Sequence, residues 1–172
     1  MALMGVTSTS SFPSSFYTFP TGQWTYDVFL SFRGKDTRYK FTSHLYKALI
    51  EEGIVTFKDD EKLDRGKLIS PELLKVIEES RIAIVILSEN YTSSNWCLDE
   101  LTKIIACKND MRMIVVPIFH YVDPSDVRKQ MGTFAHPFIE NEKEENKERV
   151  EKWRHALRQV GSIAGWHLNN TR

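Results

Sequence analysis

Short apolar runs alternate with helical patterns along most of this 172-residue chain. Each run has the length of a β-strand, and each is followed by a stretch whose apolar residues recur at intervals of three and four. Parallel strands need a long crossover, usually a helix, so this alternation predicts βαβ units with right-handed crossovers and a mainly parallel α/β sheet. The four runs cover residues 26–32, 54–57, 81–87 and 113–119.

The helical patterns carry start and stop residues. Ser70, Pro71 and Glu72 form a helix start, with a capping hydroxyl, a proline in the first turn and an acid near the positive end of the helix dipole. Pro117 has no N–H to donate, so we expect the fourth strand to end there or to lie at an edge of the sheet. The expected helices run from Phe41 to Gly53, from Ser70 to Ser80, from about Trp96 to Cys107 and through Val150, Trp153, Leu157, Val160 and Ala164, with shorter ones after Pro124 and over 133–139.

Residues 1–24 differ in composition from the remainder of the chain. They contain no charged side chain, are rich in Ser and Thr, and show no hydrophobic periodicity. This composition predicts a disordered leader over 1–24. A signal peptide would have a basic start and a continuous apolar centre, so we expect none.

Charge, hydropathy and cysteine content exclude several classes of protein. The 23 basic side chains balance 23 acidic ones, so bulk charge does not favour nucleic-acid binding. No apolar run approaches the roughly 20 residues of a membrane helix, so we expect no membrane span. Cys97 and Cys107 fall in one expected helix roughly 15 Å apart, which excludes a disulfide between them. We therefore expect a reducing compartment, the cytoplasm.

Common nucleotide and metal motifs are missing from the sequence. There is no Gly-x-Gly pair, and the segment 34–37 lacks the upstream Gly and the Ser or Thr of a phosphate loop. The five histidines form no short-spaced pair with each other or with a cysteine, so we expect no metal site and no bound cofactor. A Ser or Cys nucleophile stays open, because catalytic triads assemble in space rather than in sequence.

Several polar and aromatic residues follow the expected strands, at the sheet edge where parallel α/β proteins bind ligands. Aromatic rings stack on bases, arginine pairs with phosphate, and a carboxylate holds ribose hydroxyls or stabilises an oxocarbenium-like centre. The set therefore suits a nucleotide with a cationic leaving group, although each residue alone is usually structural. The candidates are Phe32, Arg33, Gly34, Arg65, Gly66, Trp96 and Glu100, the last two being four residues apart on one helix face.

Seven motifs in order resemble the Toll/interleukin-1 receptor (TIR) domain of plant intracellular nucleotide-binding leucine-rich-repeat disease-resistance proteins. The resemblance covers about residues 25–168. Residues 169–172 would then begin a linker to downstream domains. The motifs are 26–38 (YDVFLSFRGKDTR), 57–60 (FKDD), 63–66 (LDRG), 77–80 (IEES), 85–91 (VILSENY), 94–101 (SNWCLDEL) and 117–128 (PIFHYVDPSDVR).

The resemblance implies a flavodoxin-like fold, with a central parallel five-stranded sheet and helices on both faces. It also implies NADase activity, the cleavage of the bond between nicotinamide and ribose in NAD+ or NADP+, with ADP-ribose or cyclised and rearranged nucleotide signals as products. Glu100 matches the essential glutamate of the family, and Trp96 matches its aromatic position. Phe32, Arg33 and Gly34 match the rim after the first strand, and Asp59, Arg65, Gly66 and Ser70 match the segment that gates the pocket.

The resemblance further implies assembly into oligomers with other TIR domains. Ser43 and His44 match a pair through which plant TIR domains self-associate, and Gly161 matches a second self-association surface. Lipase-like immune signalling proteins that respond to the product are implied as downstream partners, in the cytoplasm or also the nucleus.

Two alternatives to the NADase stay open. One is a non-catalytic adaptor that works through TIR–TIR contacts alone, as animal relatives of the family do. The other is cyclic-nucleotide synthesis on a nucleic-acid scaffold, to which the neutral net charge gives no support.

Overall fold

The computed structural model describes residues 24–59, 68–135, 138 and 147–169. The expected leader, apart from Trp24, and all but the first residue of the expected linker lie outside these described residues. None of the helices in the described part of the chain is long and apolar enough to cross a membrane.

A parallel sheet of five strands forms the centre of the fold. Its order is β2-β1-β3-β4-β5, the order of flavodoxin-like proteins, and every neighbouring pair is parallel. This confirms the parallel five-stranded sheet. The strands are β1 Tyr26–Ser31, β2 Thr56–Lys58, β3 Ser80–Leu87, β4 Ile114–His120 and β5 Trp166–Leu168.

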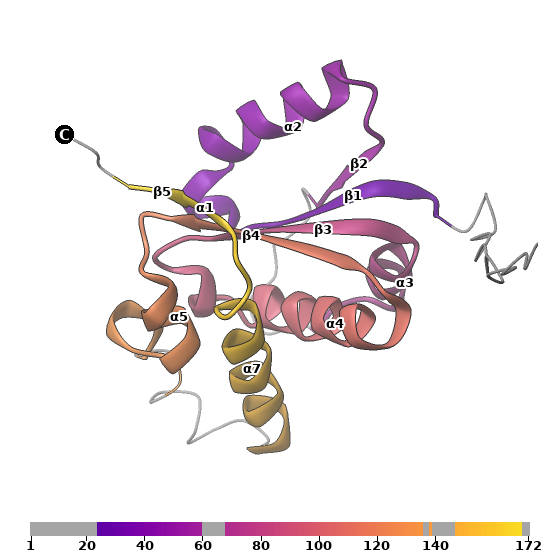
Figure 1. Ribbon diagram of the computed structural model, residues 1–172. Coiled ribbons are helices and arrows are strands. Elements are labelled where there is room, and N and C mark those ends of the chain that lie inside the picture. The colour runs from indigo at the N-terminus through magenta and orange to yellow at the C-terminus, as the bar shows by residue number, and fades with distance from the viewer. Residues whose placement is uncertain (1–23, 60–67, 136–137, 139–146, 170–172) are drawn as a thin grey trace, which may run out of the picture.

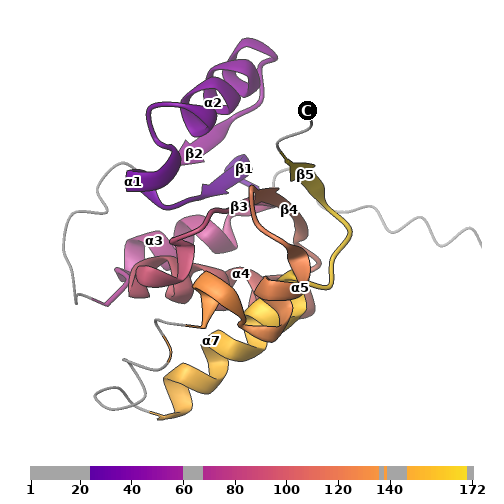
Figure 2. The same ribbon diagram turned by 90° about the vertical axis from the view of Figure 1, so that its left-hand side faces the viewer.

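Helices cover both faces of the sheet, as expected, but unequally. Figures 1 and 2 show α2, with the short α1 next to it, on one side and α3, α4, α5 and α7 on the other. The helices are α1 Gly34–Thr37, α2 Phe41–Glu51, α3 Pro71–Glu78, α4 Asn95–Met111, α5 Pro124–Lys129 and α7 Lys147–Val160, with 3-10 turns η1 Tyr91–Ser93 and η2 Gly132–Phe134.

Two hydrophobic cores correspond to these two faces. Side chains alternate along a strand, so β1 sends Phe29 into the larger core beside α4 and α7, and Leu30 into the smaller core beside α2. By the same alternation Ser31 lies on the α4 side, and Phe32 belongs to the smaller core. Of the last side chains at this end of β1, that of Ser31 can therefore contact α4 and that of Phe32 cannot.

The interpretation of Pro117 is wrong, because β4 does not end at Pro117 but continues to His120. β4 is not an edge strand, because β3 and β5 both pair with it. However, β5 begins opposite Ile118, and Pro117 pairs in register with Val85 of β3. A Cβ on Gly165 would lie 2.3 Å from the Pro117 carbonyl oxygen, so the chain enters β5 in close contact with the proline. Because the pairing with β5 begins one residue later, the missing N–H of Pro117 removes no hydrogen bond between β4 and β5.

The last helix is shorter than its apolar pattern suggested. α7 ends at Val160, which leaves Gly161 and Ala164 outside it. A Cβ on Gly161 would lie 2.8 Å from the backbone nitrogen of Arg128, so glycine lets this corner pack directly onto α5. The helix expected over 133–139 is a 3-10 turn at its start, and most of its remaining residues are not described.

The third expected helix is longer than its pattern suggested. α4 continues past Cys107 to Met111 and ends where Arg112 adopts a left-handed conformation with φ 59°. Cys97 and Cys107 are both buried, and neither belongs to a disulfide, as expected. The extra turn does not change the position of the first turns of α4, where the candidate residues lie.

Candidate functional site

Glu100 lies fully buried on α4, with 0% of its surface exposed. A buried carboxylate is rare and needs partners to offset the loss of hydration. The Ser31 hydroxyl, on the last residue of β1, donates a hydrogen bond of 3.0 Å to Oε2 of Glu100. The glutamate is therefore held at the carboxyl end of β1, at the edge of the sheet where this class of fold binds ligands.

Tyr91 extends this contact into the turn after β3. Its hydroxyl lies 2.7 Å from the Ser31 hydroxyl oxygen and donates to the Cys97 carbonyl at 3.1 Å. Burial raises the pKa of Tyr91 well above its usual value of 10.0, and electrostatic interactions with Cys97 and Glu100 raise it further, while the Ser31 hydrogen bond lowers it. Tyr91 therefore remains a protonated donor at neutral pH.

The start of α4 places Trp96 one turn before Glu100. The Ser94 hydroxyl accepts the backbone N–H of Cys97 at 3.2 Å and caps the helix, as the expected cap residues predicted. Trp96 is half-buried against the larger core, and Leu101 is fully buried in it. The regular helix confirms that Trp96 and Glu100 share a face.

Arg33 belongs to a second polar cluster at the same edge of the sheet. Its Nη1 donates to Oδ1 of Asp36 at 2.7 Å. The other oxygen of Asp36 accepts from the Ser88 hydroxyl at 2.5 Å and from the Asn90 backbone N–H at 3.1 Å. Asp36 thus joins the loop after β1 to the loop after β3 and fixes the position of the guanidinium.

The Phe32 ring is fully buried in the smaller core, so it is not the exposed aromatic surface that the sequence suggested. The Arg38 guanidinium lies over this ring, 6.0 Å from its centroid. A Cβ on Gly34 would lie 2.8 Å from Nη2 of Arg38, so Gly34 leaves room for that guanidinium. Phe32 contributes its carbonyl to the site region, where it accepts from the Cys97 thiol at 3.5 Å.

The remaining candidates of the gating segment are only partly described. Asp59 is buried directly after β2. The Ser70 hydroxyl accepts the Leu73 backbone N–H at 3.2 Å, which confirms it as the cap of α3. Arg65 and Gly66 lie outside the described residues, so the expected meeting of Arg33, Arg65 and Glu100 stays a prediction.

The candidate self-association residues lie in two different environments. Ser43 and His44 are exposed on α2, on the side of the sheet opposite α4. Gly161 is buried, and its closest neighbour is the backbone of Arg128 in the same chain. Only the α2 pair offers side chains to solvent in this structure.

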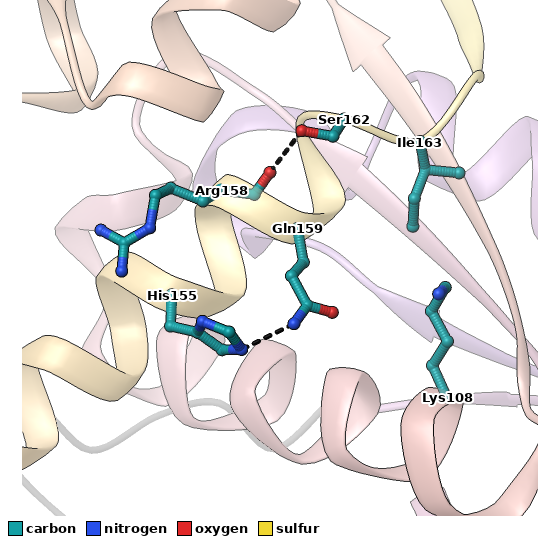
Figure 3. A pocket seen from close by; sticks show the side chains of 6 residues that line it. All are labelled: Lys108, His155, Arg158, Gln159, Ser162 and Ile163. Atoms are coloured by element: carbon teal, nitrogen blue, oxygen red, sulfur yellow. Dashed lines mark hydrogen bonds between the residues drawn. The ribbon is translucent and has the colours of Figure 1, made fainter.

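A hollow of about 500 Å³ lies elsewhere, near the last turns of α4 and α7 (Figure 3). Its lining has no carboxylate and none of the candidate residues: it consists of Lys108, His155, Arg158, Gln159, Ser162 and Ile163. His155 bonds Gln159 at 2.6 Å. In the described part of the chain no group of three His, Cys, Asp or Glu residues could hold a metal. Glu100 and the other candidate residues therefore lie outside this hollow.

Ser31, Tyr91, Asp36 and Arg38 are site residues that the sequence interpretation did not single out. Ser31 is the only polar side chain between Val28 and Phe32, and that break in an apolar strand was an available signal. Tyr91 lies 60 residues from Ser31, so only the folded chain reveals the contact. Together these residues orient the Glu100 carboxylate and, in a separate cluster, fix the Arg33 guanidinium.

Comparisons with known proteins agree with this fold. The TIR domain family model matches residues 25–172. Disease resistance protein RPV1 of Vitis rotundifolia is 56% identical over 148 residues, which are 86% of this chain and 10% of that protein. TMV resistance protein N of Nicotiana glutinosa is 51% identical over 147 residues, which are 84% of this chain and 13% of that protein. The chain thus spans roughly a tenth of the length of these curated relatives.

A solved structure of the same kind also matches. The TIR domains of the activated Roq1 resistosome, which directly recognises the pathogen effector XopQ, superpose with a TM-score of 0.77 and 54% identity, over 86% of this chain and 90% of that one. The chain belongs to the TIR domain family, with high identity to the TIR regions of plant disease-resistance proteins.

Proposed function

We propose that this TIR domain is the signalling NAD(P)+ glycohydrolase of a plant immune receptor. The observation that carries the proposal is the buried Glu100 carboxylate, held by Ser31 at the carboxyl end of β1. Membership of the TIR family and the half-buried Trp96 one turn away support it. The substrate is NAD+ or NADP+, and no resident cofactor takes part.

The proposed reaction breaks the bond between the nicotinamide nitrogen and C1′ of the ribose. The bonding electron pair leaves with the nicotinamide, which becomes neutral, and positive charge develops on the ribose. The Glu100 carboxylate stabilises that oxocarbenium-like centre. Water then adds to C1′ and loses a proton to give ADP-ribose, or a nucleophile of the same nucleotide adds to give a cyclised product. Arg33 pairs with phosphate and Trp96 stacks on a ring.

Assembly would bring copies of the domain together and switch the activity on. The Roq1 TIR domains belong to an activated resistosome. Ser43 and His44 are exposed on α2, as a self-association surface requires. We propose that the domain acts in the cytoplasm, or also in the nucleus, and that lipase-like immune signalling proteins respond to its product.

Nicotinamide release from NAD+ and from NADP+, measured over a range of protein concentrations, tests the proposal. Glu100→Gln keeps the shape of the side chain and removes its charge, so release should fall by at least a hundredfold while the circular dichroism spectrum stays the same. Glu151→Gln, an exposed change on α7, is the matched control and should keep full activity. Full activity in the Glu100→Gln variant would refute the proposal. Self-association without any nicotinamide release by the unmodified chain would favour the adaptor.

A further inference from the structure

Ser31 and Tyr91 lie between three elements that meet at the proposed site. Ser31 ends β1, Tyr91 begins η1 after β3, and Glu100 lies on α4. All three side chains are fully buried. The contacts Tyr91–Ser31 and Ser31–Glu100 join residues 60 and 69 positions apart in the sequence. Because these residues are so far apart in the sequence, their side chains come into contact only when the chain folds.

The direction of the hydrogen bonds follows from counting protons. Ser31 has one hydroxyl proton and donates it to Oε2 of Glu100 at 3.0 Å, so its oxygen can only accept from Tyr91 at 2.7 Å. Tyr91 shares its own proton between Ser31 and the Cys97 carbonyl at 3.1 Å. Each donation polarises the next hydroxyl, so the bond from Ser31 to Glu100 is stronger when the carboxylate is charged than when it is protonated.

We propose that Ser31 and Tyr91 are positioning residues for Glu100, forming a buried chain of two hydroxyls that orients its carboxylate and favours the charged form. The inference rests on the proposed function for its consequence in catalysis, but the chain itself can be measured without any activity. Among the described residues, the ionisable groups acting on Tyr91 are Glu100 and the Cys97 thiol.

Four variants of the 172-residue chain test this role. Ser31→Ala removes the direct donor, Tyr91→Phe removes the distal one, the double variant removes both, and Ser31→Thr restores a hydroxyl. Thr42→Val is the matched control, because it removes a buried hydroxyl pair with Thr37, of 2.7 Å, away from Glu100 on the α2 side. Two readouts are needed: the carboxyl carbon signal of Glu100 as a function of pH by NMR, and kcat and KM for NAD+ across the same pH range.

In Ser31→Ala the Glu100 carboxyl should titrate about one pH unit higher, since a hydrogen bond to a charged group is lost. Its kcat should fall roughly tenfold with KM within about twofold. Tyr91→Phe should give a smaller shift in the same direction, and should add nothing in the Ser31→Ala background, because the chain is linear. Ser31→Thr should recover most of kcat, and Thr42→Val should lower stability alone.

An unchanged Glu100 titration in both Ser31→Ala and Tyr91→Phe would overturn the inference, as would an equal shift in Thr42→Val. Shifted titrations with an unchanged kcat would also overturn it, because the hydroxyls would then not position the carboxylate for the reaction. If the unmodified chain releases no nicotinamide, the proposed function fails, and the NMR titration still decides whether the hydroxyls hold Glu100. If Ser31→Ala fails to fold, the Glu100 titration and the kinetic constants are measured on Tyr91→Phe and Ser31→Thr instead.

Discussion

Arg149 of α7 binds both carboxylate oxygens of Asp99 on α4, with Nε 3.2 Å from Oδ1 and Nη2 2.6 Å from Oδ2. The Trp153 indole N–H also donates to Oδ1, at 2.8 Å. Asp99 and Glu100 are neighbours on α4, and their side chains bind opposite parts of the fold, Asp99 to α7 and Glu100 to β1. The two acids together fix α4 between the last helix and the sheet.

Asp99→Ala should destabilise the domain by about 2–4 kcal/mol, because it leaves a partly buried guanidinium and an indole N–H without their acceptor. Urea denaturation followed by circular dichroism measures this loss. The exposed pair Lys152 and Glu148, 3.0 Å apart, is the control, and Lys152→Ala should cost less than about 0.5 kcal/mol. Equal losses in the two variants would show that the Asp99 contact contributes no more than a surface pair.

Gly161→Ala should lower the free energy of unfolding by about 1–3 kcal/mol, because the new methyl would lie 2.8 Å from the Arg128 backbone. The unfolding midpoint should fall even in dilute protein, where copies do not associate. Ser162→Ala, at the neighbouring exposed position, is the comparison and should change the midpoint little. A Gly161→Ala variant with unchanged stability and weaker self-association would show that the glycine serves an interface instead of this internal contact.

Asp36→Ala should release Arg33 and leave the Ser88 hydroxyl and the Asn90 N–H without their shared acceptor. If Arg33 binds substrate phosphate, KM for NAD+ should rise roughly tenfold or more, since the guanidinium loses its fixed position. Steady-state nicotinamide release at several NAD+ concentrations measures this. Lys35→Ala, an exposed change in the same short helix, should leave KM unchanged. If KM for NAD+ is unchanged in Asp36→Ala, the fixed position of Arg33 does not contribute to substrate binding.

His120 should make the domain less stable in mild acid. Burial lowers the pKa of His120 below its usual value of 6.5, although its backbone hydrogen bond and Asp36 oppose the shift. Between the lowered pKa and about 6.5 the unfolded chain binds more protons than the folded one, so the free energy of unfolding falls as the pH falls through this window. Above about pH 6.5 both states are neutral at this residue and the effect is absent.

Urea midpoints of the unmodified chain and of His120→Phe at pH 7.0, 6.0 and 5.0 measure this contribution. The aromatic replacement keeps a ring next to Phe41, whose centroid lies 5.6 Å from the imidazole. The variant should lose less stability on acidification than the unmodified chain, and His155→Gln, at an exposed position of α7, should not. Parallel pH profiles for the unmodified chain and His120→Phe would contradict the assignment.

The strand and helix patterns predicted most of the fold because they reflect local periodicity. The pair Trp96 and Glu100 was predicted correctly for the same reason, since four residues make about one turn of a regular helix. β5 escaped residue-level prediction because it has three residues and an exposed Trp166, so neither alternation nor an apolar run marks it. The resemblance to the TIR family supplied the fifth strand.

The site was harder to predict than the fold, because its contacts join residues far apart in the sequence. Phe32 was expected to present its ring at the sheet edge, yet strand alternation turns it into the smaller core. Ser31, one residue earlier, therefore meets Glu100 instead. Arg33 was predicted as a cation of the site, but its anchor Asp36 also depends on Ser88, 52 residues later. No local pattern contains such pairings.

Because the two faces of the sheet are covered unequally, we expect the smaller core under α2 to be less stable to local unfolding than the larger core under α4 and α7. α2 alone covers the smaller core, and Ile114 on that side of the fold remains 49% exposed, whereas α4 and α7 close the larger core through the Asp99 contact. Backbone amides of α2 should therefore exchange with deuterium sooner than those of α4, because opening α2 exposes less apolar surface. We therefore expect the helix carrying Ser43 and His44 to open more readily than the elements that hold Glu100 and its two hydroxyls.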